Sequence, residues 1–539
     1  MTVKGKKEFN EEEMAFAKPP EAKQVLTDIE GDDIVMVEAK SMGVDSLEMG
    51  KQEFAEENGV MKGEVQPIAY QDAWAAVLFI IQFISVVGVA ISYSSYIFSA
   101  IEVAEEDLTD DDGLTYTAEE RTTITYDASS IFVLLIISYV VAGSTTMVAL
   151  ALMMRYSEAL VKVSFFVAPL SFLAVATIFF IADDGLSTFF AFVAIFISLL
   201  MICMWFFYKK HIPFAAANLR TALSALRVNT GTYIFAFLFS IVSFLTMVLS
   251  LTAITGVQAK AESEGTEPCE DPDLQGEMCY KNPPNTFLIL FLLLGLYWTQ
   301  QVITNIVHVT TAGVVGTWWF TPIAEPSSRN ITSSLGRALT YSFGSICFGS
   351  LLIAIMQVLE QMARSQNRNG RGNILTCLIQ CIIQCLRGWL EYFNSWAFVY
   401  VALYGYPYIE AGKNVIQLFR HRGWTTIIAD RLVFRVLFFC NLAVAAVSGS
   451  LAILCDFAAG PFFPGDNEAS HVLSFFVAFF VGLFISNVVL FVIESAVRTA
   501  IVCFAESPAE FDEHHPDLSE NMKAGWAEAY PTVMGGVLT

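Results

Sequence analysis

A stripe of polar and aromatic residues runs along one apolar segment in the middle of the chain. The segment FLILFLLLGLYWTQQVITNIVHVTTAG, residues 287–313, contains Trp298, Gln301, Asn305 and His308 at spacings of three, four and three. On a helix these side chains fall within an arc of roughly 80°. Aromatic faces beside amides and an imidazole suit the binding of a cation. A hydrogen-bonded seam between neighbouring helices would use the same residues, and the stripe alone does not separate the two interpretations.

A second segment, EYFNSWAFVYVALYGYPYIEAGKNV, carries three tyrosines on related faces of a predicted helix. These are Tyr400, Tyr404 and Tyr408. Pro407 removes the backbone hydrogen bond to the carbonyl of Leu403, so the helix is expected to break there. Broken helices in membranes commonly line a cavity or pack on protein. A kinked structural helix whose Glu410 faces water is the alternative.

Asn441, on a later apolar segment, is a further candidate to face the interior of the protein. A packing hydrogen bond between helices is the simpler explanation of this single amide. We include Asn441 with Trp298, Gln301 and the other stripe residues as candidate substrate-binding residues.

Motifs for catalysis are missing from the sequence. It contains no hydrolase, kinase, P-loop or dinucleotide motif and no zinc-type cysteine pattern, so we expect no enzyme activity, no cofactor and no metal. A formal net charge of −23 argues against nucleic acid as a partner. The middle of each apolar segment lacks Asp, Glu, Lys and Arg, which favours facilitated movement of a substrate over strong ion coupling.

Apolar blocks of membrane-spanning length must position these residues. The chain is 55% hydrophobic and only 15% charged, whereas soluble proteins carry about 25% charged residues. Blocks of roughly 20 apolar residues match the hydrocarbon thickness of a bilayer, and their continuity excludes a barrel. We therefore expect an all-α polytopic membrane protein with about ten transmembrane helices. The predicted spans begin near Trp74, Ser129, Leu160, Leu186, Thr232, Thr286, Arg337, Asn394, Leu432 and His471.

Lys and Arg in the short loops predict the orientation of the spans. Basic loops follow spans two, four, six and eight, while the opposite loops are acidic, so both termini are expected in the cytoplasm. This gives a disordered cytoplasmic tail at 1–70, a transmembrane domain at 71–505 and a cytoplasmic tail at 506–539. Residues 363–388 do not follow this rule. Counting the predicted spans places this arginine-bearing segment on the outer side of the membrane. Either a re-entrant segment changes the count or the charge rule fails there.

Two loop features complete the sequence-based picture. Cys269 and Cys279 lie ten residues apart in a polar loop on the predicted outer side, where a disulfide is expected, with two free thiols as the alternative. Residues 213–228 predict a short amphipathic helix that rests on the headgroups, with Arg220 and Arg227 on its polar face.

Three blocks of this sequence resemble the choline transporter-like family, with closer similarity to its fungal, plant and protist branch. The blocks are YWTQQVITNIVHVTTAGVVGTWWF, LGRALTYSFGSICFGSLLIAIMQ and CLIQCIIQCLRGWLEYFNSWAFVYVALYGYPYIEAGKNVIQLF, followed by the similar CFAES at 503–507. The resemblance covers most of residues 70–505. It implies a ten-helix facilitative carrier of choline with both termini in the cytoplasm. The first outer loop is shorter and the cysteine run sparser than in animal members, and no family binding residue is carried over.

The apolar composition of the chain, the polar stripe and the family resemblance together predict a plasma-membrane carrier of choline or a related organic cation. Its expected partners are this small cation and the lipid bilayer, and the sequence identifies no protein partner. Two alternatives remain open at this point. One is a channel-like or lipid-handling membrane protein that uses the same polar stripe, and the other is a non-transporting membrane scaffold.

Overall fold

The computed structural model is almost entirely helical. It describes residues 69–106, 128–181, 185–268, 278–280, 282–321, 330–366, 374–422, 432–460, 462 and 467–531. The predicted N-terminal tail (except residues 69 and 70) and Cys269 lie outside these ranges. Two short strands, β1 (Thr266–Pro268) and β2 (Met278–Tyr280), pair antiparallel and place Glu267 opposite Cys279.

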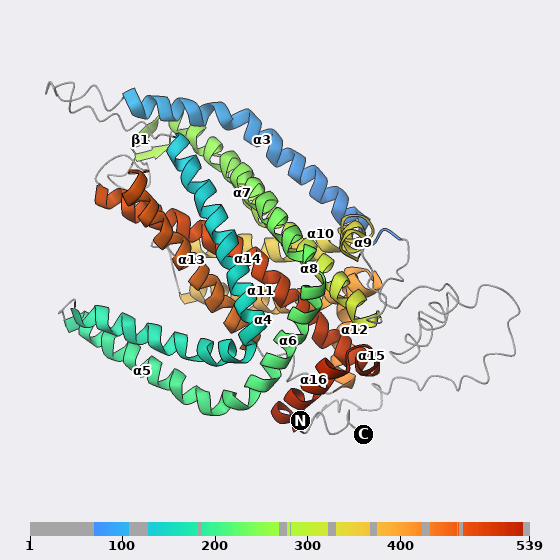
Figure 1. The fold of residues 1–539 in the computed structure, drawn as a ribbon. Helices are drawn as coiled ribbons and strands as arrows, with labels where there is room; N and C mark the ends of the chain where they lie inside the picture. Colours follow the sequence, from blue (N-terminus) through green and yellow to red (C-terminus); the bar gives the residue numbers. More distant parts are fainter. Residues whose placement is uncertain are drawn as a thin grey trace, which may run out of the picture. The chain divides into compact units, whose positions relative to one another are not determined.

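Seven helices of the described chain are long and apolar enough to cross a membrane. They are α3 (Ala73–Glu106), α4 (Ala128–Ile181), α7 (Gly231–Ser263), α8 (Thr286–Phe320), α10 (Phe343–Gln366), α13 (Leu432–Ala459) and α14 (Asn467–Glu506). Helices α3, α7 and α8 pack side by side, and α4, α13 and α14 form a second group (Figure 1). The second group contacts the first through α14 and through Tyr139 of α4, which donates to the backbone oxygen of Phe237 on α7 at 3.1 Å. This confirms the prediction of an all-α polytopic membrane protein.

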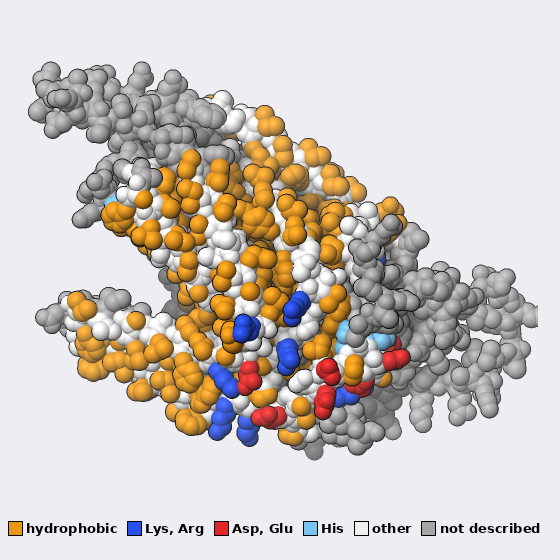
Figure 2. Space-filling model, viewed as in Figure 1, with side chains coloured by type: hydrophobic (Ala, Val, Ile, Leu, Met, Phe, Trp, Pro, Cys, Tyr) orange, Lys and Arg blue, Asp and Glu red, His pale blue; other side chains and the backbone are white. Residues whose placement is uncertain are grey.

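The remaining described helices are shorter or less apolar. They are α5 (Gly185–Tyr208), α6 (Ile212–Val228) after the short η3 (Lys209–His211), α9 (Asn330–Leu339), α11 (Ile374–Tyr404), α12 (Tyr408–His421), α15 (Pro508–His514) and α16 (Pro516–Ala529). On the face drawn in Figure 2, hydrophobic side chains cover most of the helical surface, and the Lys, Arg, Asp and Glu side chains gather at the end where α6 and α16 lie. Such a distribution fits a helical bundle with one end in water.

The count of ten spans is not confirmed, and the difference from seven concerns three elements. Predicted spans two and three both lie within α4, which consists of two helices that meet at a kink at non-helical Tyr156 (φ −128°, ψ 36°). Span four corresponds to α5, which is apolar along its 24 residues but is not among the seven helices named above. Span eight corresponds to the end of α11, and this helix also contains Arg387 and Glu391.

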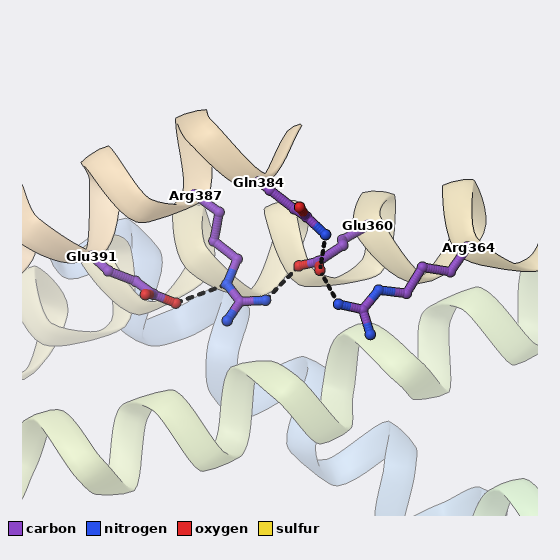
Figure 3. Close-up of polar contacts among 5 residues, drawn as sticks. All are labelled: Glu360, Arg364, Gln384, Arg387 and Glu391. Atoms are coloured by element: carbon purple, nitrogen blue, oxygen red, sulfur yellow. Dashed lines mark hydrogen bonds and ion pairs between the residues drawn. The ribbon is translucent and has the colours of Figure 1, made fainter. Parts of the chain in front are cut away.

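Residues 363–388, which broke the charge rule, contribute to an ion-pair network between α10 and α11 (Figure 3). The carboxylate of Glu360, whose side chain is 5% exposed, accepts a hydrogen bond from Arg387 and one of 2.5 Å from Arg364. Gln384 donates to the same carboxylate at 3.2 Å, and Arg387 also donates to Glu391 at 2.8 Å. Two arginines are thus paired with two glutamates in the folded protein.

The chain reverses between α11 and α12 at the predicted break. Helix α11 ends at Tyr404, Gly405 adopts a positive φ of 65°, and α12 begins after Pro407. Only glycine takes up such a φ without strain. Helix α12 then packs back across α11, where a Cβ on Gly412 would lie 1.9 Å from the ring of Phe393. The expected break at Pro407 is therefore present, as a helix reversal rather than a kink, and Glu410 is exposed.

Helix α6 forms as expected, but its apolar face is buried by other helices. Most of its residues are buried, and it packs against α4, α14 and α16, while Arg220 and Arg227 remain exposed. Helix α16 covers α6 through the fully buried Trp526, whose indole N–H donates to Asn218 Oδ1 at 3.0 Å. Because the C-terminal helices supply this cover, an apolar face that sequence alone would assign to headgroups is filled by protein.

We predict that Arg387→Gln destabilises the protein more than Arg364→Gln. Arg387 has a 34% exposed side chain and bridges Glu360 to Glu391, whereas the 57% exposed Arg364 contacts Glu360 alone. Leaving a buried carboxylate without its main partner costs about 2 kcal/mol. The thermal unfolding midpoint of purified protein in detergent measures the difference. The double variant Glu360→Gln with Arg387→Gln should recover part of the loss, and equal midpoints for the two single variants would contradict the assignment.

We predict that Trp526→Ala releases α16 from α6. Trp526 is fully buried against Phe214 and Phe504, with ring centroids 5.1 and 4.8 Å away, and removing a buried Trp side chain costs about 3–5 kcal/mol. Trypsin should then cleave faster at Lys523 within α16. Trp389→Ala, which removes a 60% exposed indole, serves as the control and should leave the cleavage rate unchanged. An unchanged rate for Trp526→Ala would show that α16 is held by other contacts.

Candidate functional site

The stripe on α8 packs between helices. The indole N–H of Trp298 donates to the carbonyl oxygen of Cys347 at 2.9 Å, and the Asn305 amide donates to Ser350 Oγ at 2.9 Å. Both acceptors belong to α10. Trp298 and Asn305 are buried, and Gln301 is half-buried on the same helix. These two contacts are those of a hydrogen-bonded seam.

His308, the fourth stripe residue, joins three helices. Its Nε2 lies 3.0 Å from the carbonyl oxygen of Ser395 on α11, and its Nδ1 lies 2.6 Å from Ser495 Oγ on α14. A carbonyl can only accept, so Nε2 carries a proton, and the Ser495 hydroxyl lies within hydrogen-bond distance of both Nδ1 and the backbone oxygen of His308. The buried imidazole of α8 therefore fixes the relative positions of α11 and α14.

Four aromatic residues follow one another along α11 at intervals of four. We call Tyr392, Trp396, Tyr400 and Tyr404 the aromatic ladder. A spacing of four turns each ring by about 40° from the previous one, so the ladder winds slowly around the helix. Ring centroids lie 6.2 Å apart for Tyr392 and Trp396, and 5.1 Å apart for Tyr400 and Tyr404.

The ladder is largely covered by protein. Trp396 and Tyr400 are both buried, and Trp396 packs against Phe419 of α12 with ring centroids 5.1 Å apart. Within the described residues the Trp396 indole N–H makes no hydrogen bond. Tyr400 and Tyr404 were candidates from the sequence, whereas Tyr392 and Trp396 were not, although the regular spacing of four includes them.

Tyr408 does not join Tyr400 and Tyr404, contrary to the shared face expected for a continuous helix. Its hydroxyl donates to Asn394 Oδ1, and its backbone N–H donates to Asp72 Oδ2 at 3.0 Å. The chain reversal before α12 turns Tyr408 toward α10 and α3, where Asp72 also accepts from Ser345 at 2.7 Å. Tyr408 therefore anchors the start of α12.

Asn441 lies apart from both groups. On α13, it accepts a hydrogen bond from Ser486 Oγ of α14 and is half-buried. This matches the packing hydrogen bond that was the simpler explanation of a lone amide in an apolar helix.

A buried carboxylate that sequence analysis did not select lies at the Tyr404 end of the ladder. Glu506, the last residue of α14, is 6% exposed, and its side chain is hydrogen-bonded to Tyr404. Arg422 donates to the backbone oxygen of Glu506 at 3.4 Å. The third ring at this end belongs to Tyr406, 5.9 Å from Tyr404 between centroids. The only sequence signal was the block CFAES, which contains Glu506.

Across the described ranges, no three His, Cys, Asp or Glu side chains lie close enough to hold a metal ion. The ladder instead offers π faces along one helix and a single carboxylate at one end. That combination can attract a cation that lacks strong hydrogen-bond donors.

Comparison with known proteins places the chain in a family. A family model described as "Plasma-membrane choline transporter" matches residues 189–509, which is more than half of the chain and includes the stripe, the ladder and Glu506. "Protein PNS1" of Gibberella zeae is 30% identical over 338 residues, covering 61% of this chain and 60% of that protein.

Two further fungal relatives give the same result. "Protein PNS1" of Eremothecium gossypii is 30% identical over 362 residues, covering 63% of this chain and 62% of the relative. "Protein PNS1" of Neurospora crassa is 30% identical over 341 residues, with 61% and 59% covered. The chain thus spans about 60% of the length of the curated relatives that it matches. The resemblance noted from the sequence blocks is confirmed, and the chain belongs to the plasma-membrane choline transporter family.

Proposed function

We propose that this protein is a facilitative carrier that moves choline or a related organic cation along the aromatic ladder of α11. The observation that carries the proposal is the ladder itself, four aromatic residues at intervals of four that lead to the carboxylate of Glu506. Family membership supports the same substrate class, since the family model is described as a choline transporter.

The chemistry of a quaternary ammonium suits this surface. Its charge is spread over methyl groups that donate no strong hydrogen bonds, so it is attracted to ring faces, by about 0.5–2 kcal/mol per contact. Successive ladder residues lie about 6 Å apart along the helix. The segment from Tyr392 to Tyr404 contains no Asp, Glu, Lys or Arg. Several weak and similar contacts let a cation advance without a deep trap, as downhill transport requires.

The reversal between α11 and α12 provides a place where the site can open. Gly405 with its positive φ and Pro407 separate two helices that pack on each other through Trp396 and Phe419. Hinges of this kind absorb backbone rotation at a few residues. In the proposal, α12 moves away from α11 and exposes the ladder to one side of the membrane at a time.

The stripe on α8 has a supporting part in this proposal. Trp298 and Asn305 join α8 to α10, and His308 joins it to α11 and α14, while Gln301 lies on the same helix. We retain all four, together with Tyr408 and Asn441, as candidate residues of the transport domain 71–505. The carrier is placed in the plasma membrane with residues 1–70 and 506–539 in the cytoplasm, and the Cys269–Cys279 disulfide stays a prediction for the outer side.

A non-transporting scaffold is a second candidate function. The observation that favours it is the dense hydrogen bonding of the stripe, since Trp298, Asn305 and His308 each have protein partners. A seam of this kind stabilises a bundle without any transport. The scaffold and the carrier differ in whether vesicles that contain the protein take up a cation.

We predict that vesicles containing the purified protein take up labelled choline and that Tyr400→Leu reduces the initial rate at least about tenfold. The substitution keeps an apolar side chain but removes a π face from the middle of the ladder, which weakens cation binding there. Phe438→Leu serves as the matched control, because Phe438 is 60% exposed on α13 and away from the ladder.

The control variant should transport at the wild-type rate. Uptake by the wild type no greater than in empty vesicles would overturn the carrier and favour the scaffold. Uptake that Tyr400→Leu leaves unchanged would show that the cation follows another route.

A further inference from the structure

We propose that the protein binds an anionic phospholipid where α4 and α5 join the rest of the molecule, with the lipid phosphate among Arg155, Lys209 and Lys210. Residues 157–181 of α4 together with α5 are called the α4–α5 hairpin, and the end at which they join the other helices is called its base. The inference concerns a lipid partner and does not depend on which cation the protein carries.

The α4–α5 hairpin is held together by its own contacts. The rings of Phe166 and Trp205 lie 4.8 Å apart between centroids, and Ser198 Oγ donates to the carbonyl oxygen of Pro169 at 2.9 Å. The first residue of each pair rises in number as the second falls, so the two helices run antiparallel. The hairpin is therefore one packed unit whose two ends differ.

The hairpin presents apolar side chains to its surroundings. Figure 1 shows it projecting from the other helices, and in the described chain the extensive contacts of α5 are with α4 and η3. Residues 163–181 and 185–208 contain no charged side chain. More than half of the surface is exposed for large apolar residues along both helices, among them Val163, Leu170, Phe189, Phe192, Phe196 and Phe206. In a bilayer these side chains contact the acyl chains of lipids.

Cations from two separate segments meet at the base. The chain enters the hairpin at the kink at Tyr156 and leaves it through η3. Lys162 precedes Phe166 by four residues and Lys209 follows Trp205 by four, so the contact between these two rings places both lysines about one helical turn away, at the same end. Figure 2 shows Lys and Arg side chains gathered in this part of the surface, bordered by hydrophobic ones.

Three of these cations are available to a ligand. Arg155, Lys209 and Lys210 are exposed, and within the described ranges none of them forms an ion pair, whereas Lys162 is paired with Glu158 at 2.6 Å. The Arg155 guanidinium lies 5.4 Å from the centre of the Tyr156 ring, and Lys209 Nζ lies 6.0 Å from that of Phe206. Both charges therefore lie close to the boundary between the apolar hairpin and water.

Neighbouring elements leave the base positive. The rings of His211 and Tyr530 lie 5.0 Å apart, which brings the end of α16 and its exposed Glu528 beside η3. Helix α6, which packs against α4 and η3, adds the exposed Arg220 and Arg227. Glu494 of α14, which also packs against α6, is paired with Arg498. Among the described residues, the cations of this region thus outnumber its carboxylates.

An acidic phospholipid fits both parts of this surface. Its phosphate can accept from a guanidinium and from ammonium groups, while its acyl chains lie along the adjoining apolar hairpin. A zwitterionic lipid such as phosphatidylcholine carries a positive group that these cations repel. Each Lys or Arg near a membrane surface strengthens the attraction of acidic lipid about fivefold. The predicted orientation places the base on the cytoplasmic side, where membranes hold their acidic lipids.

Quenching by brominated lipids tests the site on the purified full-length protein in phosphatidylcholine vesicles. Trp205 lies about one helical turn from Lys209, so bromine on the acyl chains of a lipid bound at the base should quench its fluorescence. The contribution of Trp205 is the difference between the wild type and Trp205→Phe. Brominated phosphatidylglycerol should bind at least about tenfold more tightly than brominated phosphatidylcholine, and about 0.5 M sodium chloride should weaken this preference.

Charge variants assign the preference to the base. Lys209→Gln combined with Lys210→Gln should reduce it at least about fivefold. The matched control is Lys413→Gln combined with Arg420→Gln, which removes two exposed cations of α12 and should leave the preference within about twofold of the wild type.

Glu158→Gln provides the opposite change. It releases Lys162 from its ion pair and should raise the preference for phosphatidylglycerol about twofold or more, an effect that a poorly folded variant cannot imitate.

Three results would overturn the lipid site. One is equal affinity of the wild type for the two lipids, and another is a preference that the Lys209→Gln and Lys210→Gln double variant leaves unchanged. The third is loss of quenching when inorganic phosphate replaces sodium chloride at equal ionic strength, which would assign the cations to free phosphate. Because no choline is present, each result stands apart from the success or failure of the carrier proposal.

Discussion

The imidazole of His308 holds the centre of the bundle together. One ring nitrogen faces a carbonyl of α11 and the other faces a serine of α14, so three helices share one buried side chain. In an apolar environment each of these groups must find a partner within the protein. The position of α11, and with it the direction in which the aromatic ladder faces, depends on this contact. Trp298 and Asn305 extend the same principle to α10.

Helix lengths and polar spacing were readable from the sequence because they depend on local periodicity. The apolar blocks predicted the membrane helices, and Pro407 with Gly405 predicted where the chain would break. The direction that the chain takes after this break could not be predicted from the sequence. Helix α12 packs back on α11 because Gly412 admits the ring of Phe393, a contact between segments that no periodicity reveals. Tyr408 was consequently grouped with the wrong tyrosines.

Charges were harder to interpret for a related reason. Arg387 and Arg364 appeared to violate the positive-inside rule, which counts charges along the chain and ignores their partners. In the structure they share the carboxylate of Glu360, and this pairing links residues more than twenty positions apart. Glu506 was overlooked for the opposite reason, since a glutamate at the end of a predicted span resembles an ordinary solvated residue until Tyr404 is seen beside it.

The central claim is that the ladder of α11 carries a cation by alternating exposure rather than serving as a static seam. Counterflow tests it most directly: vesicles containing the protein are preloaded with unlabelled choline and then diluted into a trace of labelled choline. A carrier exchanges the two, so labelled choline should accumulate transiently above its outside concentration. With the membrane potential held at zero by equal potassium concentrations and valinomycin, a channel would give no such overshoot and a scaffold no protein-dependent uptake, and either result would contradict this mechanism.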